Sequence, residues 1–136
     1  TGLRFFTVYG PWGRPDMAPM IFAKAILEDD KIKVFYNGMN IRDFTFIDDV
    51  VDAIIKCCEK PASINKKFDY VNPEASTSFA PHRIFNIGNS SPVQLMDFIK
   101  ILEKAFNKKA RLEYYPRQPG DVIKTGADIS LIEGWL

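Results

Sequence analysis

Hydrophobic and polar positions follow two recurring patterns along the chain, one typical of strands and one typical of helices. Short apolar runs bounded by turn residues predict strands over 3–9, 32–36, 41–47, 84–87 and 111–115. Apolar residues spaced three and four apart predict helices over 17–28, 48–60, 92–109 and a short stretch after Asp128. Because strands alternate with helices, the pattern predicts an α/β fold with parallel strand pairing.

The predicted helices carry residues suited to their first turns. Asp16 is placed to cap the first helix. Asp48 and Asp49 stand at the start of the second helix, where capping is the simplest role and negative charge suits the helix dipole. Ser91 and Pro92 open the third helix with a capping-box pattern that puts proline at the first helical position.

The same spacing predicts which side of each element faces the core. In the second helix this side carries Val51, Ile54, Ile55 and Cys58. In the third helix it carries Leu95, Ile99, Leu102 and Phe106. In strand 41–47 the alternation places Arg42, Phe44 and Phe46 on one face and Asp43 and Thr45 on the other. Residues 61–82 are polar and rich in turn formers, which predicts a long surface loop.

Composition narrows the classes of function. The 136 residues suffice for one domain with a core, and a net charge of +1 gives no broad field that would attract nucleic acid or a membrane surface. No apolar run approaches the ~20 residues of a membrane helix. The cysteines, Cys57 and Cys58, are adjacent and poorly placed for a disulfide, which favours a reducing cytoplasm. A single histidine, His82, argues against a zinc site, so no metal is expected.

The first strand runs into a turn rich in glycine and proline, in the stretch LRFFTVYGPWGRP. Ligands of open α/β sheets lie beyond the carboxyl ends of the strands, so Thr7, Tyr9 and Arg14 are expected at a rim that a ligand can reach. The chain has no glycine-rich phosphate loop, no G-x-S-x-G elbow and no tyrosine followed four residues later by lysine. The motifs present therefore favour anion binding over catalysis as the role of this chain.

Three arginines are candidates for an anion site, each with a plainer alternative. Arg14 follows Gly13 and could be a solvated loop residue. Arg42 shares a strand face with phenylalanines, so its head group needs an anionic partner, a stacking partner or a salt bridge. Arg117 and Asp121 flank a Pro-Gly turn and could serve only that turn. From the residues alone, the sequence indicates an α/β piece with a potential anion site.

Four sequence motifs indicate a more specific class of protein. LRFFTVYGPWGRPDMA, RDFTFIDDVVDAI, FNIGNSSPVQL and QPGDV occur in this order. Together they closely resemble the C-terminal part of nucleotide-sugar epimerases of the extended short-chain dehydrogenase/reductase family, and most of all the UDP-glucuronate 4-epimerase group. The resemblance covers nearly the whole chain. Both ends of the chain look cut, so we expect a piece of a longer polypeptide.

The resemblance implies the last strands of a Rossmann-type parallel sheet plus a small α/β substrate-binding domain. Residues 1–11 would form the sixth strand with its turn, and 83–90 the seventh strand. Residues 12–82 and 91–136 would form the two parts of the substrate-binding domain. The NAD loop and the Tyr-x-x-x-Lys pair of such enzymes lie upstream of the sixth strand. The chain alone is therefore expected to be inactive, and the resemblance implies a homodimer for the full-length protein.

The resemblance also implies roles for residues near the first strand. The backbone of Phe5 would face the nicotinamide carboxamide of NAD, which is bound mainly by the missing N-terminal half. Thr7 would touch the sugar, and its hydroxyl could reach a hexuronate carboxylate. Arg14 would lie near that carboxylate, where a guanidinium fork favours glucuronate over glucose. Met17 would begin the helix that lines the uridine site.

Further roles fall on the second and third strands and on the loop after the last strand. Lys33 and Phe35 would lie on the strand whose edge meets the uracil, mostly through backbone groups. Arg42 would hold the diphosphate, and Asp121 would contact the ribose. Many relatives carry an arginine three residues before that acid, whereas here Gln118 occupies the position. The resemblance therefore does not identify a second arginine that would contact the diphosphate.

The implied activity of the full-length protein is NAD-dependent epimerisation at C4 of a UDP-hexuronate, UDP-glucuronate or UDP-galacturonate, through a 4-keto intermediate. One alternative is a nucleotide-sugar dehydratase or decarboxylase of the same family. A second alternative, of a different class, is a non-catalytic domain that only binds nucleotides.

Overall fold

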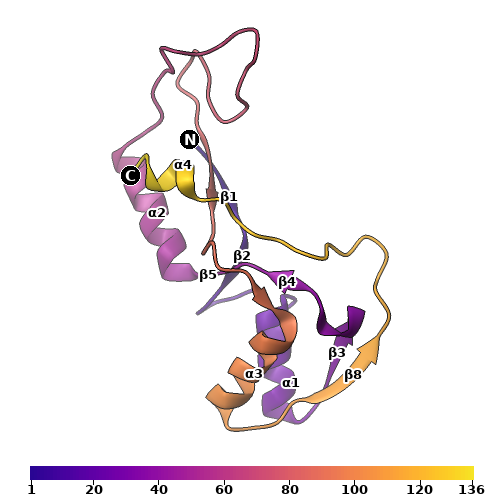
Figure 1. Ribbon diagram of the computed structural model, residues 1–136. Coiled ribbons are helices and arrows are strands. Elements are labelled where there is room, and N and C mark those ends of the chain that lie inside the picture. Colours follow the sequence, from indigo (N-terminus) through magenta and orange to yellow (C-terminus); the bar gives the residue numbers. More distant parts are fainter.

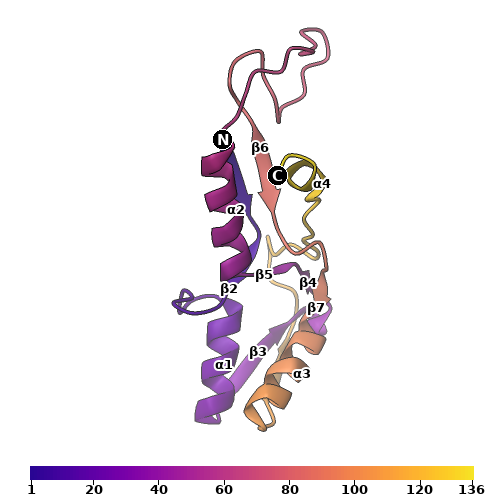
Figure 2. The same ribbon diagram turned by 90° about the vertical axis from the view of Figure 1, so that its left-hand side faces the viewer.

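The computed structural model describes residues 1–136, which form two bodies joined at the middle of an elongated molecule (Figures 1 and 2). The strands are β1 (Gly2–Phe5), β2 (Thr7–Tyr9), β3 (Lys31–Phe35), β4 (Ile41–Arg42), β5 (Phe44–Phe46), β6 (Ile84–Ile87), β7 (Val93–Gln94) and β8 (Arg111–Tyr115). The helices are α1 (Ala18–Glu28), the 3-10 helix η1 (Tyr36–Gly38), α2 (Ile47–Glu59), α3 (Leu95–Phe106) and α4 (Ser130–Glu133).

The strands pair two by two. β1 pairs with β6, β2 with β5 and β3 with β8, all in parallel, whereas β4 and β7 are antiparallel. Parallel partners are joined through helices, as the alternation of strands and helices predicts. The α/β fold class is confirmed.

The first body contains β1, β6, α2 and α4 around a small core. Its buried side chains are Val50, Cys57, Phe85, Ile87 and Ile132. The segment 61–82 extends from this body as a long loop, seen at the top of Figure 1, and a single bridge between Thr77 and Arg83 closes its base. The prediction of a surface loop is confirmed.

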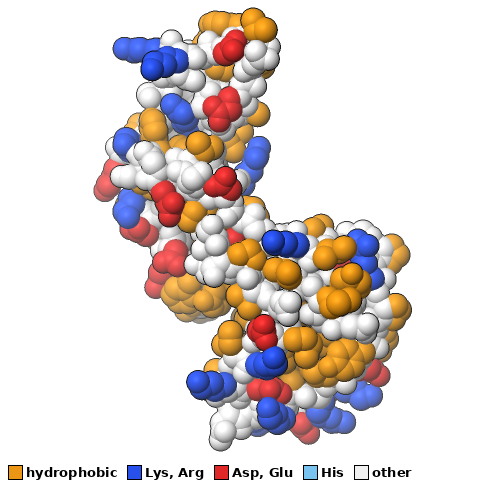
Figure 3. Space-filling view, in the orientation of Figure 1, with side chains coloured by type: hydrophobic (Ala, Val, Ile, Leu, Met, Phe, Trp, Pro, Cys, Tyr) orange, Lys and Arg blue, Asp and Glu red, His pale blue; other side chains and the backbone are white.

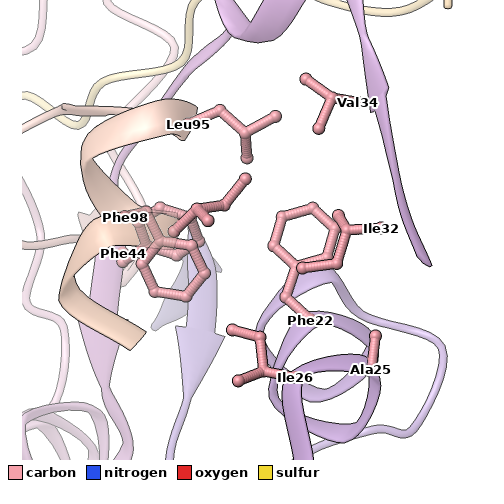
Figure 4. Packing of buried hydrophobic residues seen from close by; sticks show 9 residues of the cluster. Phe22, Ala25, Ile26, Ile32, Val34, Phe44, Leu95 and Phe98 are labelled. Atoms are coloured by element: carbon pink, nitrogen blue, oxygen red, sulfur yellow. The ribbon is translucent and has the colours of Figure 1, made fainter. Parts of the chain in front are cut away.

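The second body packs α1 and α3 against the β3–β8 pair (Figure 2). Its core is Phe22, Ala25, Ile26, Ile32, Val34, Phe44, Leu95, Phe98 and Ile99 (Figure 4). The rings of Phe44 and Phe98 stack with centroids 4.4 Å apart, which joins β5 to α3. Leu95 and Ile99 are buried, and Leu102 and Phe106 pack against this core, so the predicted face of α3 is confirmed.

Two predicted strands and one predicted helix differ from the structure by more than one residue at a boundary or by an internal break. The strand predicted over 3–9 breaks at Phe6, and the strand over 41–47 breaks at Asp43. In both, the two halves pair with different partners, so each break marks a change from one sheet to another. The third helix begins at Leu95 rather than Pro92, because Val93 and Gln94 pair with β4 instead. The predicted capping box at Ser91 is therefore wrong.

The predicted core face of α2 is also wrong. Val50 and Cys57 are buried, whereas Val51, Ile54 and Ile55 remain 36–53% exposed and Cys58 is exposed. Apolar residues cover more of this helix than one face can bury, so periodicity alone could not choose between neighbouring faces. The buried face of α2 is the one that contacts β6 and α4.

The predicted caps of the first two helices are not formed either. Met17 is the N-cap of α1 and Phe46 that of α2, and neither helix has a side-chain cap hydrogen bond. The Asp16 carboxylate binds Arg14 instead, while Asp48 and Asp49 lie in the first turn of α2, where their charge still suits the helix dipole.

Charged side chains of both signs are interspersed on the face shown in Figure 3, with hydrophobic side chains between them. None of the helices has the length and apolarity that crossing a membrane requires.

Candidate functional site

A cleft of about 680 Å³ lies where β2, β3, β4 and the start of α1 meet the loop after β8. It brings together seven of the eight residues predicted to bind substrate: Thr7, Met17, Lys33, Phe35, Arg42, Gln118 and Asp121. These residues come from five separate segments of the chain. Their convergence in one cleft is a fact of the structure, whereas their individual roles stay predictions.

The centre of the cleft is an ion pair between Arg42 and Asp121. Nη2 of Arg42 donates to Oδ1 of Asp121 at 2.8 Å, and the two side chains are 20% and 25% exposed. Nδ2 of Asn40 donates to the other carboxylate oxygen at 2.7 Å. Nη1 of Arg42 donates to the carbonyl oxygen of Ile41 at 2.9 Å. Of the alternatives that the sequence left open for Arg42, a salt bridge is therefore the one observed within the chain.

This geometry leaves a fixed cation at the cleft. A guanidinium has five N–H donors, and the contacts to Asp121 and the main chain hold its plane without using all of them. A fixed, partly shielded guanidinium can add a second anionic partner at low entropic cost. The carboxylate oxygens of Asp121 can each accept a further hydrogen bond, for example from a hydroxyl group.

An aromatic pair lies at the β3–β8 end of the cleft. The rings of Phe35 and Tyr115 are 5.5 Å apart, and the Lys33 ammonium lies 5.9 Å from the Tyr115 centroid. The Tyr115 hydroxyl donates to Glu113 at 2.9 Å and Lys31 lies 3.4 Å from the same carboxylate, which together lower the pKa of Glu113. The same hydrogen bond raises the pKa of Tyr115. This end of the cleft offers flat apolar surface and positive charge.

Arg14 is the predicted substrate residue that does not line this cleft. It lines a neighbouring cavity of about 370 Å³ together with Phe5 and Tyr9, and Met17 belongs to both cavities. Its guanidinium binds Asp16 in a fork, with Nε–Oδ1 at 3.0 Å and Nη2–Oδ2 at 2.5 Å. This hydrogen bonding lowers the pKa of Asp16 and raises that of Arg14. Asp16 itself lines the main cleft, so the fork lies at the border of the two cavities.

Two residues that the sequence did not single out, Asn40 and Tyr115, belong to this site, and a third, Asp43, is the chain neighbour of Arg42. Asn40 and Tyr115 contact the cleft residues as described above. Asp43 is 0% exposed, and the alternation pattern, which placed it on the face opposite Arg42, did not predict its burial. An acidic residue enclosed between two short strand runs was the available signal, but its burial depends on segments far away in the chain.

For a dinucleotide, the chain offers only part of a binding surface. Phe5 presents an exposed ring at the neighbouring cavity, a flat wall suited to an aromatic ring, but none of the chain's loops has the glycine-rich form that cradles a pyrophosphate. For a metal, no group of three or more His, Cys, Asp or Glu residues is close enough to hold one.

Parallel strand pairs with a charged cleft beyond strand ends are typical of α/β proteins that bind ligands at this edge. The chain belongs to the NAD dependent epimerase/dehydratase family, whose family model matches residues 1–88. The expected resemblance to nucleotide-sugar epimerases is confirmed by the relatives described next.

Protein CapI of Staphylococcus aureus is 52% identical over 129 residues, which are 95% of this chain and 39% of that protein. A probable UDP-glucuronate 4-epimerase of Rhizobium meliloti is 43% identical over 98% of this chain and 39% of its own length. The crystal structure of UDP-glucuronic acid 4-epimerase from Bacillus cereus, in complex with UDP-glucuronic acid and NAD, matches with a TM-score of 0.78. That match has 34% identity and covers 98% of this chain and 38% of the solved chain. The chain thus spans less than two fifths of the length of these relatives.

Proposed function

We propose that this chain is the sugar-nucleotide-binding part of an enzyme like UDP-glucuronate 4-epimerase. The complete protein would interconvert the C4 epimers of a UDP-hexuronate through a 4-keto intermediate, and the chain alone would be inactive. The names of the relatives support the substrate class, because both a curated relative and a solved structure are UDP-glucuronate 4-epimerases. The observation that carries the proposal is the Arg42–Asp121 ion pair in a cleft that also holds Lys33 and Thr7.

Arg42 and Asp121 would bind the UDP moiety, which carries two negative charges on its diphosphate. The remaining N–H groups of Arg42 are suited to phosphate oxygens, and the Asp121 carboxylate, oriented by Asn40, is suited to ribose hydroxyls. Gln118 lines the same cleft and could donate its amide to a phosphate where many relatives have arginine. Lys33 and the Phe35–Tyr115 pair would take the uracil, whose flat ring suits an aromatic wall.

Thr7 and Arg14 would serve the sugar itself. Thr7 lies on β2 at the cleft, where its hydroxyl can both donate and accept. The Arg14 fork already holds a carboxylate, that of Asp16, in the two-bond geometry that a hexuronate carboxylate would adopt. Exchange of one carboxylate for the other would let Arg14 distinguish glucuronate from glucose.

NAD would supply the oxidation and re-reduction at C4 of the sugar when it is bound. From this chain, Phe5 at the neighbouring cavity would touch the nicotinamide end of NAD, and the pyrophosphate would be held by another part of the complete protein. This division explains why the chain alone is expected to bind a sugar nucleotide weakly and to convert none.

UDP binding measured by calorimetry tests the role of Arg42. We expect Arg42→Ala to raise the Kd for UDP at least about tenfold, because a charged hydrogen bond to phosphate is lost. Arg111→Ala is the matched control, since Arg111 is an exposed arginine at the far end of β8. The double variant Arg42→Ala/Asp121→Asn separates loss of the cation from repulsion by an unpaired Asp121. UDP affinity equal to the parent's in Arg42→Ala would contradict the proposal.

Product analysis of the complete polypeptide tests the reaction. With UDP-glucuronate we expect UDP-galacturonate by NMR. A decarboxylated pentose product, or a dehydrated one, would instead assign the protein to the other reactions of its family.

A further inference from the structure

The Asp43 carboxylate lies at the junction of the two bodies. Asp43 is 0% exposed and separates β4 from β5. Its Oδ1 accepts the N–H of Asn89 at 3.2 Å, and its Oδ2 accepts those of Ser90 at 3.1 Å and Ala127 at 2.8 Å. Its own carbonyl oxygen accepts the N–H of Thr7 at 3.2 Å. The partners that hold this buried carboxylate are thus all main-chain groups.

These bonds join every passage of the chain between the two bodies. The chain crosses from β1–β2 to α1, from β4 to α2, from β6 to β7 and from β8 to α4. Thr7 belongs to the first passage, Asp43 to the second, Asn89 and Ser90 to the third, and Ala127 to the fourth. Figures 1 and 2 show these crossings at the middle of the molecule.

The local backbone is shaped to this carboxylate. Ser90 adopts a left-handed conformation with φ of 54°, and the successive N–H groups of Asn89 and Ser90 donate to the two oxygens of the same carboxylate. Gly88 allows the close approach, because a Cβ there would lie 2.2 Å from the Cβ of Ala127 and 3.1 Å from Oδ2 of Asp43. The junction is therefore built for a carboxylate at position 43.

Asp43 is also the direct neighbour of the cleft. Arg42 precedes it, and the strand of Arg42 is held to the Asp121 side by main-chain bonds, from Ile41 to Ile123 at 2.9 Å and from Thr125 to Ile41 at 3.1 Å. Thr7, on the other side of the cleft, is held to Asp43 itself. The Asp43 carbonyl thus holds Thr7 directly. The Asp43 carboxylate joins Ala127, on the segment that follows Asp121, to Asn89 and Ser90, which follow the strand paired with β1.

We propose that Asp43 is a positioning residue that fixes the Thr7 side of the cleft relative to the Arg42–Asp121 side. This inference rests on the proposed function, because it assigns the two sides to the sugar and to the UDP moiety. Asp43 touches neither. Asp43 sets the position of the sugar relative to the bound UDP moiety. Reaction rates are sensitive to errors in the position of the reacting group of about 1 Å.

The test compares Asp43→Asn with the parent in the complete polypeptide. An asparagine keeps the size of the side chain but places an NH2 group against main-chain N–H donors. We expect the Kd for UDP to change little, because the main-chain bonds beside Arg42 remain. We expect kcat for UDP-glucuronate to fall on the order of 10- to 100-fold, because the sugar is misplaced. Amide hydrogen exchange at Asn89, Ser90 and Ala127 should accelerate in the ligand-free protein.

Val50→Ala is the control for a merely structural role. Val50 is buried in the core of the first body, so this variant loses stability without touching the junction, and its kcat should match the parent's below its melting temperature. If Asp43→Asn does not fold, Thr125→Val serves in its place, since it removes only the hydroxyl that accepts the Asp43 N–H at 3.4 Å. Thr125→Val should also lower kcat, by a smaller factor than the one expected for Asp43→Asn.

The outcomes separate this inference from the proposed function. An unchanged kcat in folded Asp43→Asn protein, or a parallel loss of UDP affinity, would overturn the positioning role while the parent still binds and converts UDP-glucuronate. A parent that binds no UDP would overturn the proposed function, and the positioning role with it.

Discussion

Arg42 and Asp121 differ from the other charged pairs of the chain because both partners are mostly shielded from water. Pairs such as Lys24–Glu28 are exposed on both sides and contribute little to stability. A shielded pair at a cleft costs desolvation that a surface pair avoids, so its retention there fits a role in binding. The Arg14–Asp16 fork is the opposite case, exposed on both sides and free to exchange partners.

That exchange predicts opposite effects for two neighbouring substitutions. Arg14→Ala should weaken UDP-glucuronate much more than UDP-glucose, because only the glucuronate has a carboxylate for the fork. Asp16→Asn should increase the preference for UDP-glucuronate, because it frees the guanidinium from its internal partner. Inhibition constants of both sugar nucleotides in the complete polypeptide measure the effect. Equal losses for the two ligands in Arg14→Ala would remove Arg14 as the carboxylate contact.

The turn between α3 and β8 shows how one side chain fixes the end of an element. α3 ends at Asn107 in a left-handed conformation, and Oε1 of Glu103 then accepts the N–H of Ala110 at 2.9 Å. Lys109 lies 3.1 Å from the other oxygen. The backbone hydrogen bond, with the Lys109 contact added, lowers the pKa of Glu103. This turn sets the start of β8, and with it the position of Tyr115 at the cleft.

A lowered pKa makes the contribution of Glu103 dependent on pH. The folded state favours the ionised carboxylate, so its stabilising effect is fully present above the ordinary glutamate pKa and is lost as pH falls through the lowered pKa of the folded state. Glu103→Gln should therefore unfold more easily than the parent at pH 7 and by a smaller margin at pH 3, as measured by urea titration. Glu59→Gln, at the end of α2, is the control and should unfold with the parent at both pH values. An equal deficit of Glu103→Gln at both pH values would contradict this account.

The molecule as a whole exposes more surface than its size requires. A compact protein of 15.5 kDa has a surface of about 7,200 Å², whereas this chain exposes 9111 Å². Part of the excess is the apolar side of α2, where Val51, Ile54 and Ile55 have no cover. Uncovered apolar patches on a surface promote association.

We therefore expect the isolated 136-residue chain to associate as its concentration rises. Ile55→Lys should reduce this association, because it places a charge on the open face of α2. Ile101→Lys is the matched control, since Ile101 is 58% exposed on α3 and Ile55 is 53% exposed. Sedimentation velocity measures both variants. A parent that stays monomeric at all concentrations, or an equal effect of the two lysines, would contradict the prediction.

Local patterns were sufficient for much of the fold, whereas the residues that line the cleft were predicted through the family resemblance. The strands over 84–87 and 111–115 have the predicted bounds, and Leu95 and Ile99 face the core as expected. The motif containing Arg42 pointed to the cleft through resemblance, and the spacing alone left several partners open for its guanidinium. The predictions of these strands and of the buried face of α3 succeed because strand and helix periodicities are properties of short segments.

Other features depended on partners that are distant in the sequence. Asp43 is buried because turns more than forty residues away supply its N–H donors. Val51 is exposed because β6 and α4 cover the neighbouring side of its helix. The sequence by itself determined where most strands and helices form, and which of their residues are apolar or charged. Only the tertiary structure decided which face is covered and which charge finds a partner, because those contacts form between segments whose local patterns carry no information about each other.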